Sequence, residues 1–197
     1  MYKLDTEAAR GAESTGSRIT EKGKYKGKFL RAQHIESEKT GTVGIDFDFQ
    51  ANDGGRARFS IYTTKADGTR IYGFKQVMAI MTCLGIRELA EPKNVPAKIY
   101  DYDAQREVER VVLQFPELIG KPIGLLLAME EYSAGKWRPN LGGVFQEHTE
   151  LGASEILDRK TTPTKLPLML QALKDRPMRE GAAPAGDAPP SGHPAAY

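Results

Sequence analysis

The segments "VGIDFDFQ" (43–50) and "RARFSIYTT" (56–64) place apolar side chains at every second position. Successive side chains of a β-strand point to opposite faces of a sheet, so this alternation predicts two strands that each bury one face. The intervening "NDGG" (52–55) contains residues that tolerate positive φ, which is typical of a hairpin turn. The chain must therefore fold around a sheet.

Further elements follow from the same kind of pattern. Strands are predicted from about Lys24 to Ser37, over 107–115 and over 122–132. The segment "GFKQVMAIMTCLG" (73–85) instead has apolar residues at helical spacing and ends at a glycine, which predicts one helix laid over the sheet.

The order of these elements suggests an architecture. Asn140, Gly142 and Gly143 indicate a turn that leads to "GVFQEH". Three strands, a helix and then more strands favour a mainly β protein with one helix, as a small Greek-key barrel of the oligonucleotide-binding (OB-fold) type. A β-grasp fold and an α+β sandwich are the alternatives.

The chain divides by composition. Its 197 residues, 40% of them apolar, are enough for one core of ordinary size. We expect a flexible N-terminal arm (1–17), an OB-fold domain (18–150), a linker with a short helix (151–175) and a disordered tail rich in Pro, Ala and Gly (176–197).

Charge is spread unevenly along the chain. The 28 Lys and Arg nearly balance the 26 Asp and Glu, yet "RITEKGKYKGKFLR" (18–31) contains six basic residues and one acid. On a strand, Lys24, Lys26 and Lys28 share one face and repel each other. Either Asp46 and Asp48 on the next strand neutralise them, or the row binds a phosphate backbone with release of counterions.

The segment 56–75 repeats this basic character and adds aromatic rings. Basic groups that follow a backbone, with rings on which bases stack, are typical of non-specific single-strand binding. The alternatives are solvated strand faces that protect against aggregation, and tyrosines that are half-buried in the core. The residues predicted to bind nucleic acid are Lys24, Lys26, Lys28, Arg31, Arg56, Arg58, Tyr62, Tyr72, Lys75, Trp137 and Arg138.

Little in the sequence indicates catalysis. Cys83 is the only cysteine, and the three histidines are scattered without the spacing of metal ligands, so we expect no cofactor, no metal site and no enzyme. A nuclease that uses Asp46 and Asp48 is the enzymatic alternative. No segment has the roughly 18 apolar residues of a membrane span, and the N-terminal segment has no apolar signal core, so a cytoplasmic protein without membrane partners is expected.

Several motifs resemble the phage single-stranded DNA-binding proteins over about residues 19–147. The motifs are the strand opening Gly23-x-Tyr25, the alternating strand from Ile45 to Phe49, the Ile119-Gly120-Lys121 turn, and Glu130-Glu131-Tyr132 before a charged hairpin. The tail departs from many single-strand binders, because it holds one late acid, Asp187, and no acidic tip.

The resemblance implies an OB-fold protein that coats and protects single-stranded DNA during phage replication, recombination or repair, without sequence preference. It implies single-stranded DNA and replication or recombination proteins of phage or host as partners, in the cytoplasm of an infected bacterium. Whether the chain forms a homo-oligomer stays open. The alternative function is a protein-interaction module, a recombination accessory or assembly factor, that uses a sheet edge or the Leu168–Leu173 helix.

Overall fold

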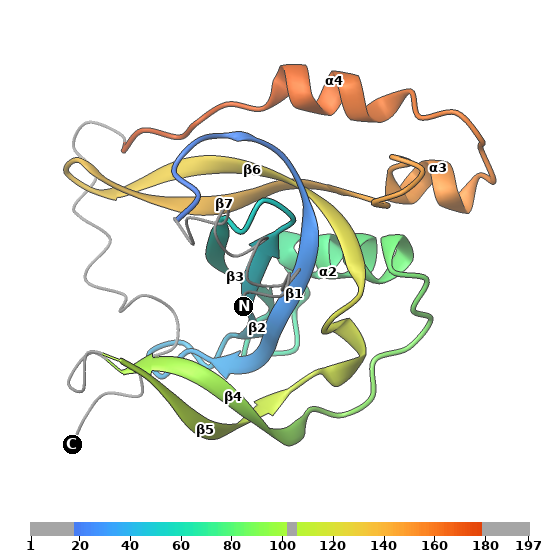
Figure 1. Cartoon of the computed structure of the whole chain (residues 1–197). Helices are drawn as coiled ribbons and strands as arrows, with labels where there is room; N and C mark the ends of the chain where they lie inside the picture. The colour runs from blue at the N-terminus through green and yellow to red at the C-terminus, as the bar shows by residue number, and fades with distance from the viewer. Residues whose placement is uncertain (1–17, 102–105, 179–197) are drawn as a thin grey trace, which may run out of the picture.

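The computed structural model describes residues 18–101 and 106–178 (Figure 1). The predicted arm (1–17) and residues 179–197 of the predicted tail lie outside the described residues. Among those that are described, no helix has the length and apolar character needed to cross a membrane.

The architecture is mainly β, as predicted. All seven strands of the described chain belong to one antiparallel sheet, in which β3-β2-β1-β5-β4 are neighbours, β6 pairs with β1, and β7 pairs with β6. The strands are β1 (Gly23–Glu36), β2 (Val43–Ala51), β3 (Arg56–Thr64), β4 (Lys93–Asp101), β5 (Arg106–Gln114), β6 (Pro122–Ser133) and β7 (Lys136–Phe145).

The long strand β1 connects the two halves of the sheet. Its first part pairs with β6 and its second part with β2, and the change occurs at Gly27, which is opposite both Ile123 and Ala51. A Cβ atom at Gly27 would lie 2.0 Å from the carbonyl oxygen of Gln50. Only glycine lets the two backbones approach this closely.

Helices cover the sheet or follow it. Within 18–150, α2 (Tyr72–Cys83) is the predicted helix, and it is accompanied by the short 3-10 turn η1 (Pro116–Leu118). It ends before Gly85, whose φ of 67° closes the helix, with Ile86 N donating to the carbonyl of Met81 over 2.8 Å. The linker contains α3 (Ala153–Leu157) and α4 (Lys165–Ala172), of which α4 matches the expected short helix.

The structure corrects one part of the predicted fold, because the described sheet does not close into the predicted small barrel. The described strands form an open sheet, because β3 and β7 are not hydrogen-bonded to each other. Other groups occupy their edges: Ile19 N donates to the Arg56 carbonyl (2.8 Å), and Gln76 Nε2 of α2 donates to the Leu141 carbonyl of β7 (3.0 Å). These two groups satisfy one backbone carbonyl on β3 and one on β7.

The core forms on the face that the alternating apolar residues share. Phe29, Phe47, Phe49 and Phe59 are buried together, and the ring centroids of Phe29 and Phe47 lie 4.5 Å apart. Leucines of β6 and apolar side chains of α2 complete this core. The opposite face of β1, β2 and β3 is thus left for polar side chains.

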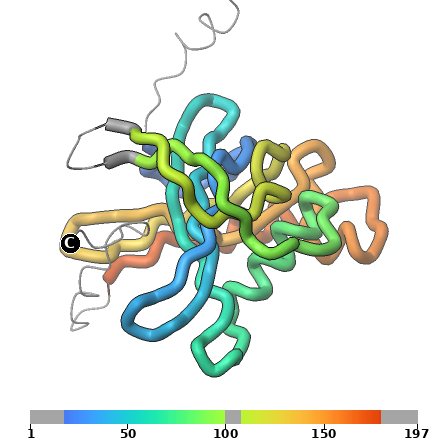
Figure 2. The backbone as a smooth tube through the Cα atoms, turned by 90° about the horizontal axis from the view of Figure 1, so that it is seen from below, coloured from blue at the N-terminus to red at the C-terminus, as the bar shows by residue number. Residues whose placement is uncertain are grey.

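One predicted turn was misplaced, and one strand was missed. The β6–β7 hairpin turns at Ala134 and Gly135, where Gly135 has a φ of 70°, so Asn140, Gly142 and Gly143 lie inside β7. Strand β4 was not predicted, although Pro96 fits it: proline is tolerated on an edge strand, and β4 pairs with β5 alone in the described sheet. The β4–β5 and β6–β7 hairpins project on the same side of the molecule (Figures 1 and 2).

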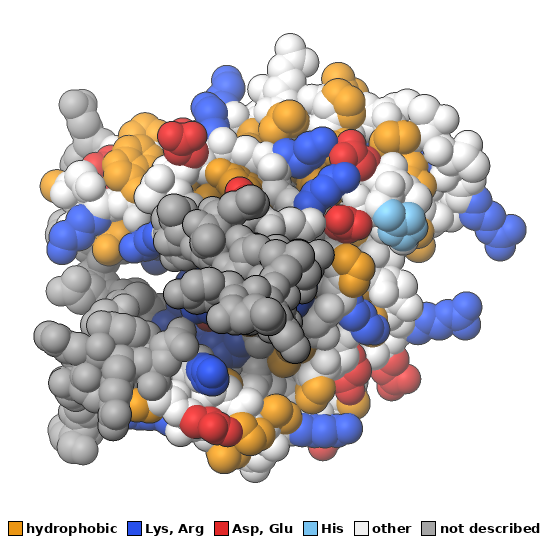
Figure 3. Space-filling model, viewed as in Figure 1, with side chains coloured by type: hydrophobic (Ala, Val, Ile, Leu, Met, Phe, Trp, Pro, Cys, Tyr) orange, Lys and Arg blue, Asp and Glu red, His pale blue; other side chains and the backbone are white. Residues whose placement is uncertain are grey.

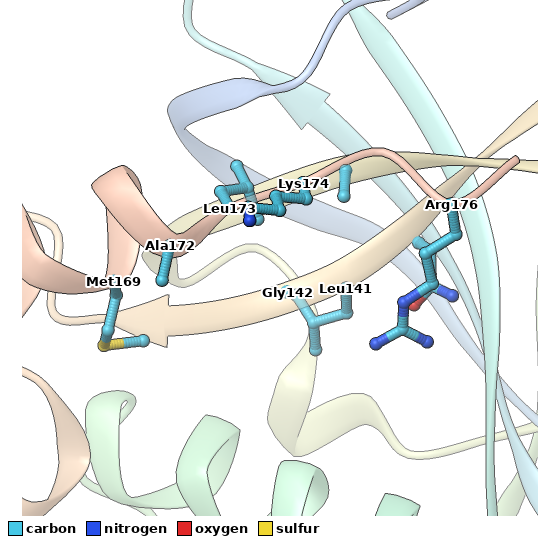
Figure 4. A pocket seen from close by; sticks show the side chains of 9 residues that line it. Leu141, Gly142, Met169, Ala172, Leu173, Lys174 and Arg176 are labelled. Atoms are coloured by element: carbon cyan, nitrogen blue, oxygen red, sulfur yellow. The ribbon is translucent and has the colours of Figure 1, made fainter.

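The C-terminal described residues pack against β6 and β7. Arg176 N donates to the Met129 carbonyl (2.8 Å), and its own carbonyl accepts from Glu131 N (2.9 Å). Arg176 therefore pairs with the free edge of β6 beside Glu130. The predicted disorder from residue 176 is thus corrected for Arg176, Pro177 and Met178, which the structure describes. A cavity of about 350 Å³ lies between this segment, α4 and β7 (Figure 4).

Candidate nucleic-acid interface

The register of β1, β2 and β3 assembles most of the predicted basic residues on one face. Lys28 is opposite Gln50, which is opposite Arg56; one row further, Arg31 is opposite Asp48, which is opposite Arg58. A shift of register between Phe29 and Arg31 keeps Arg31 on the face of Lys28. We call this surface the cationic face and define it by Lys24, Lys26, Lys28, Arg31, Arg56, Arg58, Asp46 and Asp48.

A buried carboxylate organises the centre of the cationic face. Asp46 is fully buried, and its Oδ2 accepts from Arg31 Nη2 (2.7 Å) and Arg58 Nε (3.0 Å), while Oδ1 accepts from Ser60 Oγ (2.8 Å). Arg58 Nη2 lies 2.9 Å from Asp46 Oδ2 but is not aligned to hydrogen-bond with it. Two arginines thus share one carboxylate, and Arg58 keeps donor capacity.

The second carboxylate of the face, Asp48, has different surroundings from Asp46. Burial raises the pKa of the half-buried Asp48, although the nearby Arg31, Arg56 and Arg58 act to lower the pKa. Burial disfavours the charged form of a carboxyl group. Burial therefore opposes the charged form of Asp48 more strongly than the three arginines favour it.

The lysines of β1 have a different counter-charge from the one expected. Glu150 Oε1 lies 3.0 Å from Lys24 Nζ and 2.8 Å from Lys26 Nζ. The alternative in which Asp46 and Asp48 neutralise the lysine row is therefore wrong for these two residues. Lys28 is exposed at the point where β1 passes from β6 to β2.

Aromatic side chains lie at one end of the face. Tyr62 follows Arg56, Arg58 and Ser60 on the same side of β3 and is 39% exposed. Six residues of strand separate Tyr62 from Arg56, which is about 20 Å. Tyr72 and Lys75, both exposed, belong to the first turn of α2, which approaches the Tyr62 carbonyl at Gly73 and packs against the core side of the sheet.

Trp137 lies near the opposite end of the face. It is 37% exposed on the β6–β7 hairpin, and Arg18 Nη2 donates to its carbonyl oxygen (3.4 Å). Arg18 also forms a β-bridge with Arg56, so this segment connects Trp137 to the first residue of β3. Neither Arg18 nor Glu150 was predicted as part of the site; Arg18 does belong to the basic stretch 18–31, but nothing marked Glu150.

Arg138 belongs to a different surface from Trp137. Neighbouring residues of a strand face opposite ways, and Arg138 shares the side of Glu130. Its Nη2 lies 3.1 Å from Glu130 Oε2, and its guanidinium lies over the Tyr132 ring at 5.6 Å from the centroid. In the structure Arg138 is therefore engaged with Glu130 and Tyr132, on the side of β7 opposite to Trp137.

Features typical of catalysis do not gather at this face. No group of three His, Cys, Asp or Glu side chains that could hold a metal ion occurs within 18–101 and 106–178. Burial raises the pKa of the Cys83 thiol to about 12, which opposes formation of a nucleophilic thiolate. The cavity of Figure 4 is lined by none of the predicted residues.

Comparison with known proteins adds no family to this description. No family model matches the chain, and no curated protein matches it. The fold and the face define a class, namely a mainly β protein with an open antiparallel sheet that carries a cationic face on its β1–β2–β3 meander. Lys and Arg side chains are spread over the molecule in Figure 3, with Asp and Glu beside several of them.

Proposed function

We propose that this protein binds single-stranded DNA without sequence preference, and coats and protects it during phage DNA replication, recombination or repair. One observation carries the proposal: six basic side chains and two carboxylates share the same face of three adjacent strands. Two exposed rings lie close to it: Tyr62 at one end of the face, and Trp137 on the β6–β7 hairpin, whose backbone contacts Arg18.

The chemistry of such a face suits an unpaired strand. Phosphates would bind at the basic side chains and release counterions, which makes affinity fall as salt rises. Unpaired bases would stack on the exposed rings, at about 1 to 3 kcal/mol per base. Stacking does not discriminate strongly between bases, so the binding is expected to be independent of sequence.

A titration tests this function. A fluorescent oligo-dT and a duplex of equal length would be titrated with the protein at low and high salt, and Trp137 emission recorded. We expect tighter binding of oligo-dT, weaker binding at high salt and quenched Trp137 emission. Equal binding of duplex and single strand, or no binding at low salt, would overturn the proposal.

A pair of variants locates the interface. Arg56→Ala with Trp137→Ala should weaken oligo-dT binding together, because both residues lie where the 18–19 segment connects β3 to β7. The control is Lys160→Ala, an exposed lysine between α3 and α4. Unchanged affinity in the double variant would remove these two side chains from the interface.

A protein-interaction module is the second candidate, and one observation favours it. Leu168 and Leu170 of α4 are 64% and 40% exposed. Under this function the protein is captured by a replication or recombination protein of phage or host, and Leu168→Ser weakens the capture, while labelled oligonucleotide is not shifted at low salt. Both functions place the protein in the cytoplasm of an infected bacterium.

A further inference from the structure

The turn after β7 brings a carboxylate onto the lysine row of β1. It is closed by hydrogen bonds from Gln146 N to the Leu151 carbonyl and from Glu150 N to the Gln146 carbonyl, both 2.9 Å. Glu150 has a φ of 62°, in the left-handed region that costs free energy for a residue other than glycine. The Glu150 side chain is therefore held against β1 at some conformational cost.

The contact has the geometry of an anion site. A single oxygen, Glu150 Oε1, lies within 3.0 Å of two ammonium groups, those of Lys24 and Lys26. The three side chains are 36%, 35% and 31% exposed, so solvent and solutes reach them. One anionic oxygen between two ammonium groups is also how a phosphate oxygen would bind here.

We propose that Lys24 and Lys26 form a phosphate subsite of the cationic face, and that Glu150 occupies this subsite as an internal competitor until a DNA backbone displaces it. The inference rests on the proposed function, because it assigns a phosphodiester to this part of the same face. Lys24 and Lys26 share the side of Lys28, so a DNA backbone bound there continues along β1 toward the exposed Lys28 and then Arg56 on β3.

The competitor is present under ordinary conditions. Hydrogen bonds from Lys26 and then Lys24 hold the pKa of Glu150 below its ordinary value, so the carboxylate is ionised at neutral pH. A protein whose binding-competent state is only partly populated binds its ligand with an affinity reduced by that fraction. Removing the charge of Glu150 should therefore increase affinity for single-stranded DNA.

The test compares two substitutions of equal charge. Glu150→Gln removes the competitor, and Glu147→Gln changes the net charge equally on the same turn, where Glu147 has no ion pair with the lysines. Binding of labelled oligo-dT would be measured by fluorescence anisotropy over a series of salt concentrations. We expect Glu150→Gln to bind about threefold to tenfold more tightly than the wild type, and Glu147→Gln to stay close to the wild type.

A double-mutant cycle separates the subsite from a general charge effect. In a Lys24→Ala, Lys26→Ala background, Glu150→Gln should no longer increase affinity, because the groups that it frees are gone. An equal gain in both backgrounds, or equal behaviour of the Glu150 and Glu147 variants, overturns the subsite while DNA binding stands. If the wild type and every variant fail to bind oligo-dT at low salt, the proposed function fails and the subsite fails with it.

Discussion

Asp46 and Asp48 lie two residues apart on the same face of β2, but their surroundings differ. Asp46 is fully buried and accepts hydrogen bonds from two arginines and a serine. Asp48 is half-buried, and burial raises its pKa. At the scale of single residues, the cationic face therefore depends on which carboxylate each arginine reaches, because Arg31 and Arg58 both turn to Asp46.

Substitution of Asp46 should be severe. Asp46→Asn keeps the shape of the side chain but leaves the guanidinium of Arg31, whose side chain is 4% exposed, without its counter-charge. Removing one partner of a buried ion pair costs about 3 to 5 kcal/mol, because the other charge stays buried. We expect a loss of that size in the free energy of unfolding, measured by urea denaturation followed by circular dichroism.

Asp48→Asn is the matched control on the same strand face. Burial already disfavours the charged carboxylate of Asp48, so a neutral amide should change the free energy of unfolding by less than about 1 kcal/mol. If Asp48→Asn destabilised the protein as much as Asp46→Asn, the assignment of Asp46 as the organising carboxylate would be wrong.

At the scale of elements, the shape of β1 decides what the sheet can present. The strand pairs with β6, then with β2, and its outward side chains run from Lys24 to Arg31 over both partners. Gly27 permits this passage, because the Gln50 carbonyl occupies the space of a Cβ atom. The lysines of β1 are continuous with Arg31 and Arg58 only because β1 pairs with strands in both halves of the sheet.

Gly27→Ala should therefore disrupt the sheet. The added methyl group meets backbone rather than a flexible side chain, so β1 or β2 must move. We expect a loss of about 3 kcal/mol in the free energy of unfolding, the upper part of the range for overpacking. Gly23→Ala is the control in the same strand, since its Cβ would be 3.4 Å from the nearest ring atom of Tyr25.

Helix α4 is attached to α3 by a second buried carboxylate, that of Glu155. Glu155 Oε1 accepts from Thr164 N (2.7 Å), Thr164 Oγ1 (2.8 Å) and Lys165 N (3.0 Å), and Oε2 accepts from Gly152 N (2.9 Å). These bonds lower the pKa of Glu155 to about 2. The carboxylate thus connects α3 to the first residues of α4.

The lowered pKa predicts how stability depends on pH. A group whose pKa is lowered by folding contributes stability above its ordinary value of 4.5, and the contribution is lost as pH falls toward about 2. Glu155→Gln should lower Tm at pH 7, and the difference from the wild type should shrink between pH 4.5 and 2. Thermal melts over this range measure it, with the exposed Asp158→Asn as control; a constant difference would contradict the assignment.

Local sequence patterns predicted the ends of elements correctly where a glycine determines the backbone conformation of its own turn. Gly85 ends α2, and Gly54, with a φ of 88°, turns the β2–β3 hairpin. The same signal misled in β7, where Cβ atoms at Gly142 and Gly143 would lie 2.4 Å from Leu173 and from Met169. Those glycines make room for α4 and the residues after it, a contact between distant segments that no local pattern contains.

At the scale of the whole molecule, the site was predictable only in part. Alternation placed Arg56, Arg58 and Tyr62 on one face, because that face follows from the period of a single strand. The pairing of Lys24 and Lys26 with Glu150 depends on a turn more than 100 residues away in the chain.

The charge distribution of the whole molecule predicts how salt acts on binding. When log affinity is plotted against log salt concentration, each contact between the protein and a phosphate of single-stranded DNA adds about 0.7 to the steepness of the fall. Loss of one such contact should make the slope shallower by about 0.7. Lys28→Ala removes an exposed lysine from the middle of the cationic face, so the salt dependence of oligo-dT binding should become shallower by about this amount. Anisotropy titrations at four or more salt concentrations would measure it.

Lys160→Ala changes net charge equally, but Lys160 lies after α3, outside the cationic face, so its slope should match that of the wild type. A DNA backbone that follows the cationic face must pass Lys28, which lies between Lys26 and Arg56. Single-stranded DNA held only by the general positive charge of the protein would instead respond alike to both variants. Equal slopes for Lys28→Ala and Lys160→Ala would therefore show that the bound strand does not follow β1.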